Sequence, residues 1–330
     1  MTTTLLAAGT AFSTIAPPPS PPEANRPLAV GTSRLPLIRA LPGDEDAPDT
    51  LLGQYIPLQY HHQMLDQQAR IGGFEEAIAR VVKPGMTVLE LGAGTGVLSF
   101  FAARAGAARV YAVERLPHVA MAARALIAAN GHADRVDVIE ADAMAYLPPE
   151  PVDVVICEML HCAMLREKQL TMIASFKERY LTRFGGPLPR FVPEAAVLAV
   201  QPVTTSYDFH GYRAPVPMFV DRTNAHRTSN LAPPAVYGLF TYADAYATTF
   251  EIDHALVMER DGTLDSLRFI TKNLLALLED EGRSIDWDMH DFVVPLSTPV
   301  EVHAGDIVRL RFSYGAGDSV LALLESIDRA

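Results

Sequence analysis

The segment Val88–Gly96, which reads Val-Leu-Glu-Leu-Gly-Ala-Gly-Thr-Gly, has the residue types best suited to binding chemistry. A short apolar run with β-branched residues leads into it and a stretch of helical composition follows, so it is expected to join a strand to a helix. Gly92, Gly94 and Gly96 allow the backbone to pass close to a ligand and to adopt positive φ without steric cost. Open α/β sheets bind ligands at this end of a strand, so the segment indicates a ligand site.

Acidic residues at the ends of successive expected strands indicate which ligand. The carboxylate of Glu90, two residues before the first glycine, would attract an ammonium group and repel a pyrophosphate. Val97 stands where a dinucleotide fingerprint needs its third glycine, which argues against a nucleotide-dependent oxidoreductase. Glu114 can accept hydrogen bonds from ribose hydroxyls, and Asp142, followed by Ala143, can accept one from an adenine amino group. Together they indicate S-adenosylmethionine (SAM), which carries an ammonium group and no phosphate.

An alternation of strands and helices is expected to position these residues. Before the glycine-rich segment, a helix begins near Tyr60 and runs to Arg70, Gly72-Gly73 interrupts it, and Phe74–Val82 resumes it. The expected strands are Met86–Leu91, Arg109–Glu114, Arg135–Glu140 and Val152–Glu158, and the expected helices are Val97–Ala105, Pro117–Asn130 and Glu167–Leu181. Strands that alternate with helices of this length predict right-handed crossovers and a buried parallel sheet.

The pattern changes after Gly185-Gly186-Pro187. The later strand candidates, with no regular helices between them, are Phe191–Val203, Thr248–Val257, Ser266–Leu275, Asp291–Pro295 and Ile307–Ser313. The sequence therefore predicts an α/β chain with a Rossmann-like SAM-binding domain at residues 51–184 and a mainly antiparallel, β-barrel-like domain at residues 185–330. Residues 1–50, which include a proline-rich run, are predicted to form a disordered or extended tail.

Composition excludes several classes of function. The chain has 39 acidic and 27 basic residues among its 330, a net charge of −12, and no basic run of the kind that binds nucleic acid. No stretch reaches the roughly 20 apolar residues of a membrane span, so no membrane partner is expected. Cys157 and Cys162 are too few for a disulfide framework, which favours a reducing cytoplasm. His161 lies near both, but no second Cys/His cluster completes a metal site, so no metal is predicted.

From Tyr55 onward the chain resembles the protein arginine methyltransferases, a family of class I SAM-dependent enzymes. The segments that carry the resemblance, in the family's order, are Tyr60–Arg70, Val88–Gly96, Arg109–Glu114 and Val152–Glu158. The resemblance implies that Arg70 pairs with the SAM carboxylate, that His61 lines the site and that Met64 packs beside the transferred methyl group. It also implies a homodimer, in which the segment Asp208–Pro234 is the arm that docks on a second subunit.

The same family has two glutamates nine positions apart on a substrate hairpin, and Glu158 and Glu167 have this spacing. A guanidinium keeps its proton at pH 7, and two carboxylates can hold it by charge-assisted hydrogen bonds. They also draw positive charge away from the target nitrogen, leaving its lone pair more available. If the segment were a helix, the two residues would lie about 13 Å apart, so the hairpin is expected from the resemblance alone.

The acceptor side departs from the family. Met159-Leu160-His161-Cys162 replaces the usual Trp-Met-Gly-Tyr, and Asp286-Trp287 stands where the family has a Thr-His-Trp loop. His161 is a candidate acceptor-pocket residue or general base, and Asp286 and Trp287 are candidate pocket residues. The acceptor is expected to be cationic: free arginine, a peptide arginine or a guanidino-bearing small molecule. An aromatic carbon or an amine in natural-product biosynthesis stays open, as does a SAM-binding pseudoenzyme.

Overall fold

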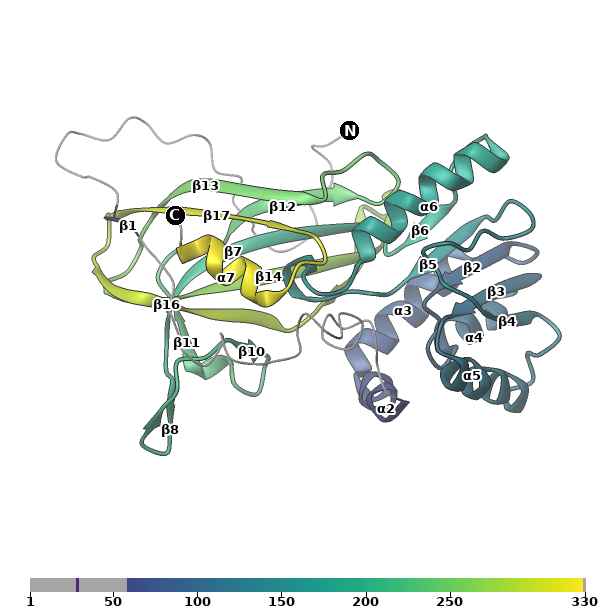
Figure 1. Ribbon diagram of the computed structural model, residues 1–330, viewed down its shortest axis with the longest axis horizontal. Helices are drawn as coiled ribbons and strands as arrows, with labels where there is room; N and C mark the ends of the chain where they lie inside the picture. Colours follow the sequence, from purple (N-terminus) through teal and green to yellow (C-terminus); the bar gives the residue numbers. More distant parts are fainter. Residues whose placement is uncertain (1–27, 30–57, 329–330) are drawn as a thin grey trace.

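The computed structural model describes residues 28–29 and 58–328, which fold into two units in contact with one another (Figure 1). The first begins with helices α2 (Leu58–Asp66) and α3 (Gln68–Val81). The tail predicted for residues 1–50 lies outside the described residues, except for β1 (Leu28–Ala29), which pairs in parallel with a C-terminal strand.

A five-stranded parallel sheet forms the centre of the first unit, in the order β4-β3-β2-β5-β6. Its strands are β2 (Thr87–Leu91), β3 (Arg109–Glu114), β4 (Val136–Glu140), β5 (Val154–Cys157) and β6 (Arg190–Val192). The connecting helices are α4 (Val97–Arg104), α5 (Pro117–Ala129) and α6 (Gln169–Phe184). This is the predicted Rossmann-like arrangement, in which the carboxyl ends of β2, β3, β4 and β5 meet at one edge.

The expected strand Phe191–Val203 is two strands that belong to different sheets. β6 pairs with β5 in the parallel sheet, whereas β7 (Ala195–Thr205) begins the antiparallel domain. Pro193 lies between them and has no N–H group to offer either ladder, which suits a change of sheet. The domain boundary predicted at residue 185 therefore falls before the last strand of the parallel sheet.

The second unit is mainly antiparallel, as predicted, and its strands form two sheets. The larger follows the order β10-β16-β14-β7-β11, with β12 on β7 and β15 on β14; the smaller is β1-β17-β13. Its strands are β10 (Met218–Val220), β11 (Thr228–Asn230), β12 (Ala235–Thr241), β13 (Thr249–Val257), β14 (Gly262–Leu278), β15 (Arg283–Asp288), β16 (Asp291–Val302) and β17 (Ile307–Gly315). Tyr237 joins the two sheets, since its ring packs edge-on against Phe269 and Phe312 and its hydroxyl bonds that of Tyr314 at 2.7 Å.

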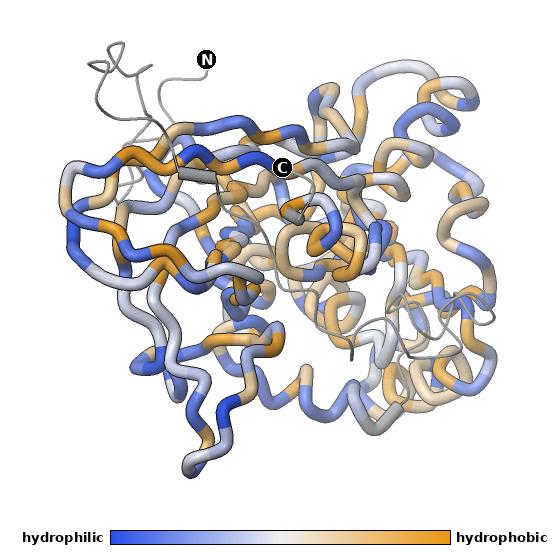
Figure 2. The backbone as a smooth tube through the Cα atoms, turned by 60° about the vertical axis from the view of Figure 1, so that its left-hand side comes forward, coloured by the Kyte–Doolittle hydropathy of each residue, from blue (hydrophilic) through white to orange (hydrophobic). Residues whose placement is uncertain are grey.

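Two smaller features complete the unit. Strands β8 (Asp208–Phe209) and β9 (Tyr212–Arg213) form a hairpin that projects from the β domain (Figure 1). Helix α7 (Val320–Asp328) packs on β17 near the end of the chain. Apolar and polar stretches alternate along the tube in Figure 2, and no described helix has the length and apolar character needed to span a bilayer.

The helix break predicted at Gly72-Gly73 is wrong. α3 runs through both glycines, and the break between α2 and α3 falls at Gln67. A Cβ atom built at Gly73 would lie 3.0 Å from Leu275 Cδ1 and 3.6 Å from the Asp286 carbonyl oxygen, whereas one at Gly72 would meet nothing within 4 Å. Gly73 therefore allows the helix to approach β14 and β15 closely, a reason that only the tertiary structure reveals.

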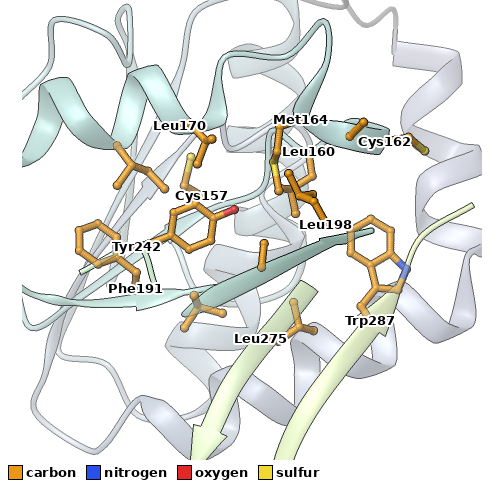
Figure 3. Close-up of a cluster of buried hydrophobic side chains, with 14 of the residues drawn as sticks. Cys157, Leu160, Cys162, Met164, Leu170, Phe191, Leu198, Tyr242, Leu275 and Trp287 are labelled. Atoms are coloured by element: carbon orange, nitrogen blue, oxygen red, sulfur yellow. The ribbon is translucent and has the colours of Figure 1, made fainter. Parts of the chain in front are cut away.

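One hydrophobic core runs through both units. Figure 3 shows Cys157 and Phe191 of the parallel sheet near Leu198 and Leu275 of the β domain, with the Trp287 ring at one side of the cluster. Trp287 also packs against Phe74 of α3, with ring centroids 6.0 Å apart. This shared core fixes the cleft between the units.

Candidate functional site

A cavity of about 1200 Å³ lies where the two units meet. It is bounded by α2 and α3, the glycine-rich turn, the loop between β5 and α6, and strands of the β domain. The predicted site residues in its lining are His61, Met64, Arg70, Glu90, Gly92, Gly94, Glu114, Asp142, Ala143, Glu158, His161, Glu167 and Trp287. Gly96 and Asp286 lie outside the lining.

The glycine-rich turn wraps closely around side chains from two other elements. Gly92, Gly94 and Gly96 have φ values of 78°, 55° and 82°. A Cβ atom at Gly94 would lie 2.7 Å from His61 Cε1, and one at Gly92 would lie 3.0 Å from Met159 Sδ. Two of the three glycines therefore let α2 and the β5–α6 loop approach the turn from the cavity side.

Gly96, predicted as a cofactor residue, faces the other way. It precedes α4 as the N-cap residue, and a Cβ atom there would lie 3.2 Å from Ile127 Cγ1 of α5. Its position assigns it to close packing between α4 and α5.

Two buried carboxylates follow the turn. Glu90 is 2% exposed and accepts a hydrogen bond from Ser99 Oγ; burial raises its pKa to about 8. Glu114 is 8% exposed and accepts hydrogen bonds from the N–H groups of Gly94 at 3.0 Å and Leu116 at 2.8 Å. The donors that hold both side chains are neutral, and a cation bound here would stabilise the charged form of Glu90.

Asp142 and Ala143 continue this wall after β4. Asp142 Oδ1 accepts a hydrogen bond from the Met144 N–H at 2.9 Å, which fixes the carboxylate at the start of a turn. Ala143 is 7% exposed and lines the cavity with it. The structure therefore brings the three acids of the sequence prediction to one edge of the sheet.

Glu158 and Glu167 lie at opposite ends of the loop that joins β5 to α6. Its only regular part is the short helix η1 (Cys162–Met164), and Ala163, Met164 and Arg166 have φ between 55° and 61°. Left-handed residues turn the chain back, so the loop is not a continuous helix and both glutamates reach the same cavity. This agrees with the hairpin implied by the resemblance.

The loop is anchored to the β domain at both ends of η1. The Ala163 N–H donates to Thr271 Oγ1 of β14 at 2.7 Å, and Cys162 Sγ donates to the His290 carbonyl oxygen at 2.7 Å. The Arg166 N–H donates to the Asp318 carbonyl oxygen at 2.7 Å. The β domain therefore positions the glutamates, although they belong to the parallel-sheet unit.

Arg70 pairs with Glu158 rather than standing apart from the glutamates. Its guanidinium forms an ion pair with Glu158 and lies 5.5 Å from the centre of the Trp287 ring. Burial lowers the Arg70 pKa to about 10. Burial also raises the pKa of Glu167 to about 8, opposed by the charge of Arg70. A guanidinium thus already lies beside Glu158 and within electrostatic reach of Glu167.

Gln169, which sequence reasoning missed, holds the backbone on both sides of Glu158. Its side chain is buried; Nε2 donates to the Cys157 carbonyl oxygen at 2.7 Å, and Oε1 accepts from the Met159 N–H at 2.8 Å. A single amide therefore fixes the peptide units before and after Glu158. The only signal in the sequence is its place two residues after Glu167.

His161 belongs to an apolar part of the wall. Its ring packs edge-on against Phe219 and Phe292, with centroids 5.8 Å and 6.5 Å away, and Nδ1 contacts the Cys162 carbonyl oxygen at 3.1 Å. Burial lowers its pKa to about 4. A neutral imidazole of such low basicity suits a cavity wall better than the predicted role of general base.

The β-domain wall carries charges that the sequence prediction did not assemble. Asp286, predicted for the pocket, instead pairs at 2.7 Å with Lys272, and it is Lys272 that lines the cavity. Arg268 and Asp291 line it as well, from β14 and the start of β16. No local motif announces these residues, because strand pairing brings them together.

Known proteins resemble this chain in both sequence and fold. Residues 88–181 match the family described as a methyltransferase domain. The arginine N(omega)-methyltransferase of Streptomyces achromogenes subsp. streptozoticus is 32% identical over 298 residues, which are 82% of this chain and 80% of that protein. Protein arginine N-methyltransferase 6 of Xenopus laevis is 33% identical over 45% of this chain and 43% of its own length.

Two solved structures share the fold at 21% identity. Arabidopsis thaliana protein arginine methyltransferase 10 superposes with a TM-score of 0.66 over 79% of this chain and 89% of its own. The Trypanosoma brucei PRMT1 enzyme–prozyme heterotetrameric complex with AdoHcy gives 0.62 over 78% and 87%. Both likenesses extend through the parallel sheet and the β domain together.

Proposed function

This chain belongs to the arginine N-methyltransferase family, and from that premise we propose that it methylates a guanidino nitrogen of a small arginine-like acceptor. The chain is a SAM-dependent methyltransferase. When bound, SAM supplies an electrophilic methyl group on a sulfonium. The residues of the chain then have to hold the acceptor, orient it and take up its proton.

The cavity wall beside the glycine-rich turn fits SAM chemically. Glu90 and Glu114 offer two buried carboxylates held by neutral donors, and a ligand with an ammonium group and ribose hydroxyls can satisfy both. Gly94 leaves room for His61 against the turn, where a side chain would collide with it. We propose that Glu90, Glu114 and Asp142 hold the cofactor, with His61 and Met64 closing over it from α2.

The observation that carries the acceptor proposal is the position of Arg70. Its guanidinium pairs with Glu158 and interacts electrostatically with Glu167, so both carboxylates already interact with the chemical group that they are proposed to bind. A substrate guanidinium at this place would leave Arg70 free to turn toward the SAM carboxylate. Glu158 and Glu167 would then orient the acceptor nitrogen, and Glu167 could accept its proton.

Transfer of tritium from labelled SAM tests this function directly. The acceptors are free L-arginine, an arginine-rich peptide and tryptophan. We expect label in a guanidino product, and a loss of about 10³-fold in turnover for Glu158→Gln and Glu167→Gln with binding of S-adenosylhomocysteine (SAH) unchanged. Glu178→Gln, an exposed change on α6, is the control. Unaltered turnover in Glu158→Gln, or label only in tryptophan, would refute the guanidino proposal.

We also propose a homodimer that uses the β8–β9 hairpin. Two sets of exposed apolar side chains are accessible to a partner: Tyr212 and Val216 on and beside the hairpin, at 72% and 43% exposed, and Met121 and Leu126 on α5, at 66% and 43%. In a twofold dimer each hairpin would meet the other subunit's helices, covering both sets. Light scattering should give twice the chain mass, and Tyr212→Asp should lower it.

The two cysteines support the proposal of a cytoplasmic location. Cys157 and Cys162 are both buried free thiols in the described structure. Free thiols are compatible with a reducing compartment, where no disulfide framework is needed.

A further inference from the structure

Arg268, Asp291 and the loop that carries the glutamates set a fixed distance across the cavity. We propose that Arg268 and Asp291 form a head-group subsite that binds the α-carboxylate and α-ammonium of a free amino-acid acceptor. The proposal rests on the guanidino function above and specifies its substrate: an arginine-like amino acid with both α groups free, rather than a peptide.

Arg268 is buried, and its ion pair with Asp291 is a long one. Its side chain is 14% exposed, and its hydrogen-bond acceptors are uncharged: Gln201 Oε1, Asn230 Oδ1 at 2.6 Å and Thr228 Oγ1 at 3.4 Å. Its carboxylate neighbour Asp291 lies 3.7 Å away, beyond hydrogen-bond distance. Neutral acceptors orient a guanidinium without cancelling its charge, and the long ion pair with Asp291 involves no hydrogen bond, so Arg268 can still bind an anion from the cavity.

Asp291, in contrast, would be stabilised by a positive charge from the ligand. It lies in the cavity wall beside Arg268, and Asp288, also in the lining, adds a second negative charge nearby. The pKa of Asp291 is raised to about 6, chiefly by burial; the charge of Arg268 opposes this, the charge of Asp288 adds to it, and that of His290 opposes it. An ammonium group would relieve both of the effects that raise it. The α-ammonium and α-carboxylate of an amino acid share one carbon, so their separation matches an Arg–Asp pair that is only loosely joined.

The subsite and the glutamates are held at a constant separation. Arg268 and Ile270 are two residues apart on β14, so their side chains lie on the same face of the strand, and both line the cavity. Thr271 of this strand accepts the hydrogen bond from Ala163 in the glutamate loop, and Cys162 of the loop bonds the carbonyl of His290, next to Asp291. The protein therefore fixes the distance between the carboxylates that hold the guanidinium and the charges that hold the head group.

An apolar wall suits the methylene stem between those two ends. His161 lines the cavity with its ring against Phe219, which also lines it. Its low pKa keeps the imidazole neutral at pH 7, so it adds no charge that would repel a cationic acceptor. A peptide arginine would bring two amides instead of two charges to the subsite, so Arg268 and Asp291 would gain no charged partner from it.

Acceptor analogues that lack the α-carboxylate, the α-ammonium charge or neither test each half of the subsite separately. The series is L-arginine, agmatine, which lacks the carboxylate, L-argininamide, which keeps only the ammonium, and Nα-acetyl-L-arginine, which keeps only the carboxylate. In the wild type we expect kcat/KM for agmatine to be roughly 30-fold below that for L-arginine. Arg268→Gln should impose a similar loss on L-arginine and Nα-acetyl-L-arginine, with less than a threefold change for agmatine. Asp291→Asn should affect L-arginine and L-argininamide and spare Nα-acetyl-L-arginine.

Three outcomes would overturn the subsite: equal kcat/KM for agmatine and L-arginine, a better rate with the peptide, or an equal loss on all acceptors in Arg268→Gln. Because Arg268→Gln could disturb folding, Arg268→Lys, which keeps the charge, and the melting temperature are measured beside it. Calorimetric binding of L-arginine with SAH present separates the two proposals. Binding of L-arginine but not agmatine, without turnover, supports the subsite and refutes the guanidino transferase; no binding of either refutes the subsite.

Discussion

The two walls of the cavity balance their charges in different ways. On the parallel-sheet side, Glu90 and Glu114 are buried carboxylates held by a hydroxyl and by backbone N–H groups. On the β-domain side, Lys272 pairs with Asp286, and Arg268 lies near Asp291. The carboxylates of the first wall are held by neutral donors, whereas each of these basic side chains of the second wall lies near an acidic one.

This difference indicates what each wall can discriminate. A wall whose carboxylates are held by neutral donors favours a ligand with a well-placed ammonium group, so it suits a cofactor common to many enzymes. A wall of paired charges gains little from a simple cation or anion and most from a ligand that carries both. We therefore expect changes on the first wall to alter cofactor affinity, and changes on the second wall or the glutamate loop to alter acceptor turnover.

The largest effect that would break this division comes from Gln169. Gln169→Met removes both hydrogen bonds to the peptides around Glu158 and leaves a buried carbonyl and N–H unpaired. We expect kcat to fall about 100-fold while the SAH dissociation constant changes less than threefold. Gln169→Glu, which keeps the acceptor for the Met159 N–H, should lose less. Steady-state assays measure kcat, and titration calorimetry measures the SAH dissociation constant.

The matched change on the other wall is Ser99→Ala, which removes the donor to Glu90. It should weaken SAH binding and leave kcat at saturating SAM unchanged. If Gln169→Met weakened SAH binding as much as it lowered kcat, or if kcat did not change, the division between the walls would be wrong.

Glu90→Gln should have the next largest effect. The amide keeps the size of the side chain but cannot take the charged form that pairs with the cofactor ammonium, so we expect SAH to bind roughly 30-fold more weakly. Glu140→Gln is the control, because Glu140 also ends a strand of the sheet but is exposed. Equal affinities of the two variants would show that the first wall does not bind the cofactor through this acid.

A smaller effect, on kcat/KM for each pH unit, is expected from the titration of Glu167. Its pKa is raised to about 8, so in the free enzyme the carboxylate needed for a guanidinium is protonated at lower pH. At saturating SAM, kcat/KM for the acceptor should rise about tenfold per pH unit from pH 6 toward 8 and level off above it. A flat profile over this range would contradict the assignment of Glu167 as an acceptor ligand.

Sequence reasoning succeeded where function depends on neighbours along the chain. Strand–helix alternation predicted the parallel sheet, and the acids at the ends of β2, β3 and β4 were found because parallel strands end at one edge. The place of Glu167 required the family resemblance, since the nine-residue spacing alone does not show that the loop turns back through Ala163 and Met164.

Sequence reasoning failed where the structure depends on the pairing of strands that are far apart in the chain. Arg268 and Asp291 meet because β14 pairs with β16 in a register that places Arg268 opposite Val293. Asp286 and Trp287 lie on a strand that was not predicted, and only its pairing with β14 shows that Trp287 faces the cavity while Asp286 turns to Lys272. No local pattern of residues encodes these registers.

The smallest predicted effect asks whether the two walls form one rigid body. A Cβ atom added at Gly73 of α3 would lie 3.0 Å from Leu275 Cδ1 on β14, whereas one added at Gly72 would meet nothing within 4 Å. Gly73→Leu should force the helix away from the β domain and destabilise the protein by about 1–3 kcal/mol, a drop of several degrees in melting temperature. Gly72→Leu should raise stability by up to about 1 kcal/mol, because leucine favours a helix over glycine. Scanning calorimetry measures both.

If Gly73→Leu also lowers turnover with L-arginine and leaves SAH affinity unchanged, then the contact of α3 with the β domain holds the acceptor wall in place. Equal melting temperatures for the two variants would instead mean that the walls move independently, and that the distance between Glu158 and Arg268 is not fixed by this contact.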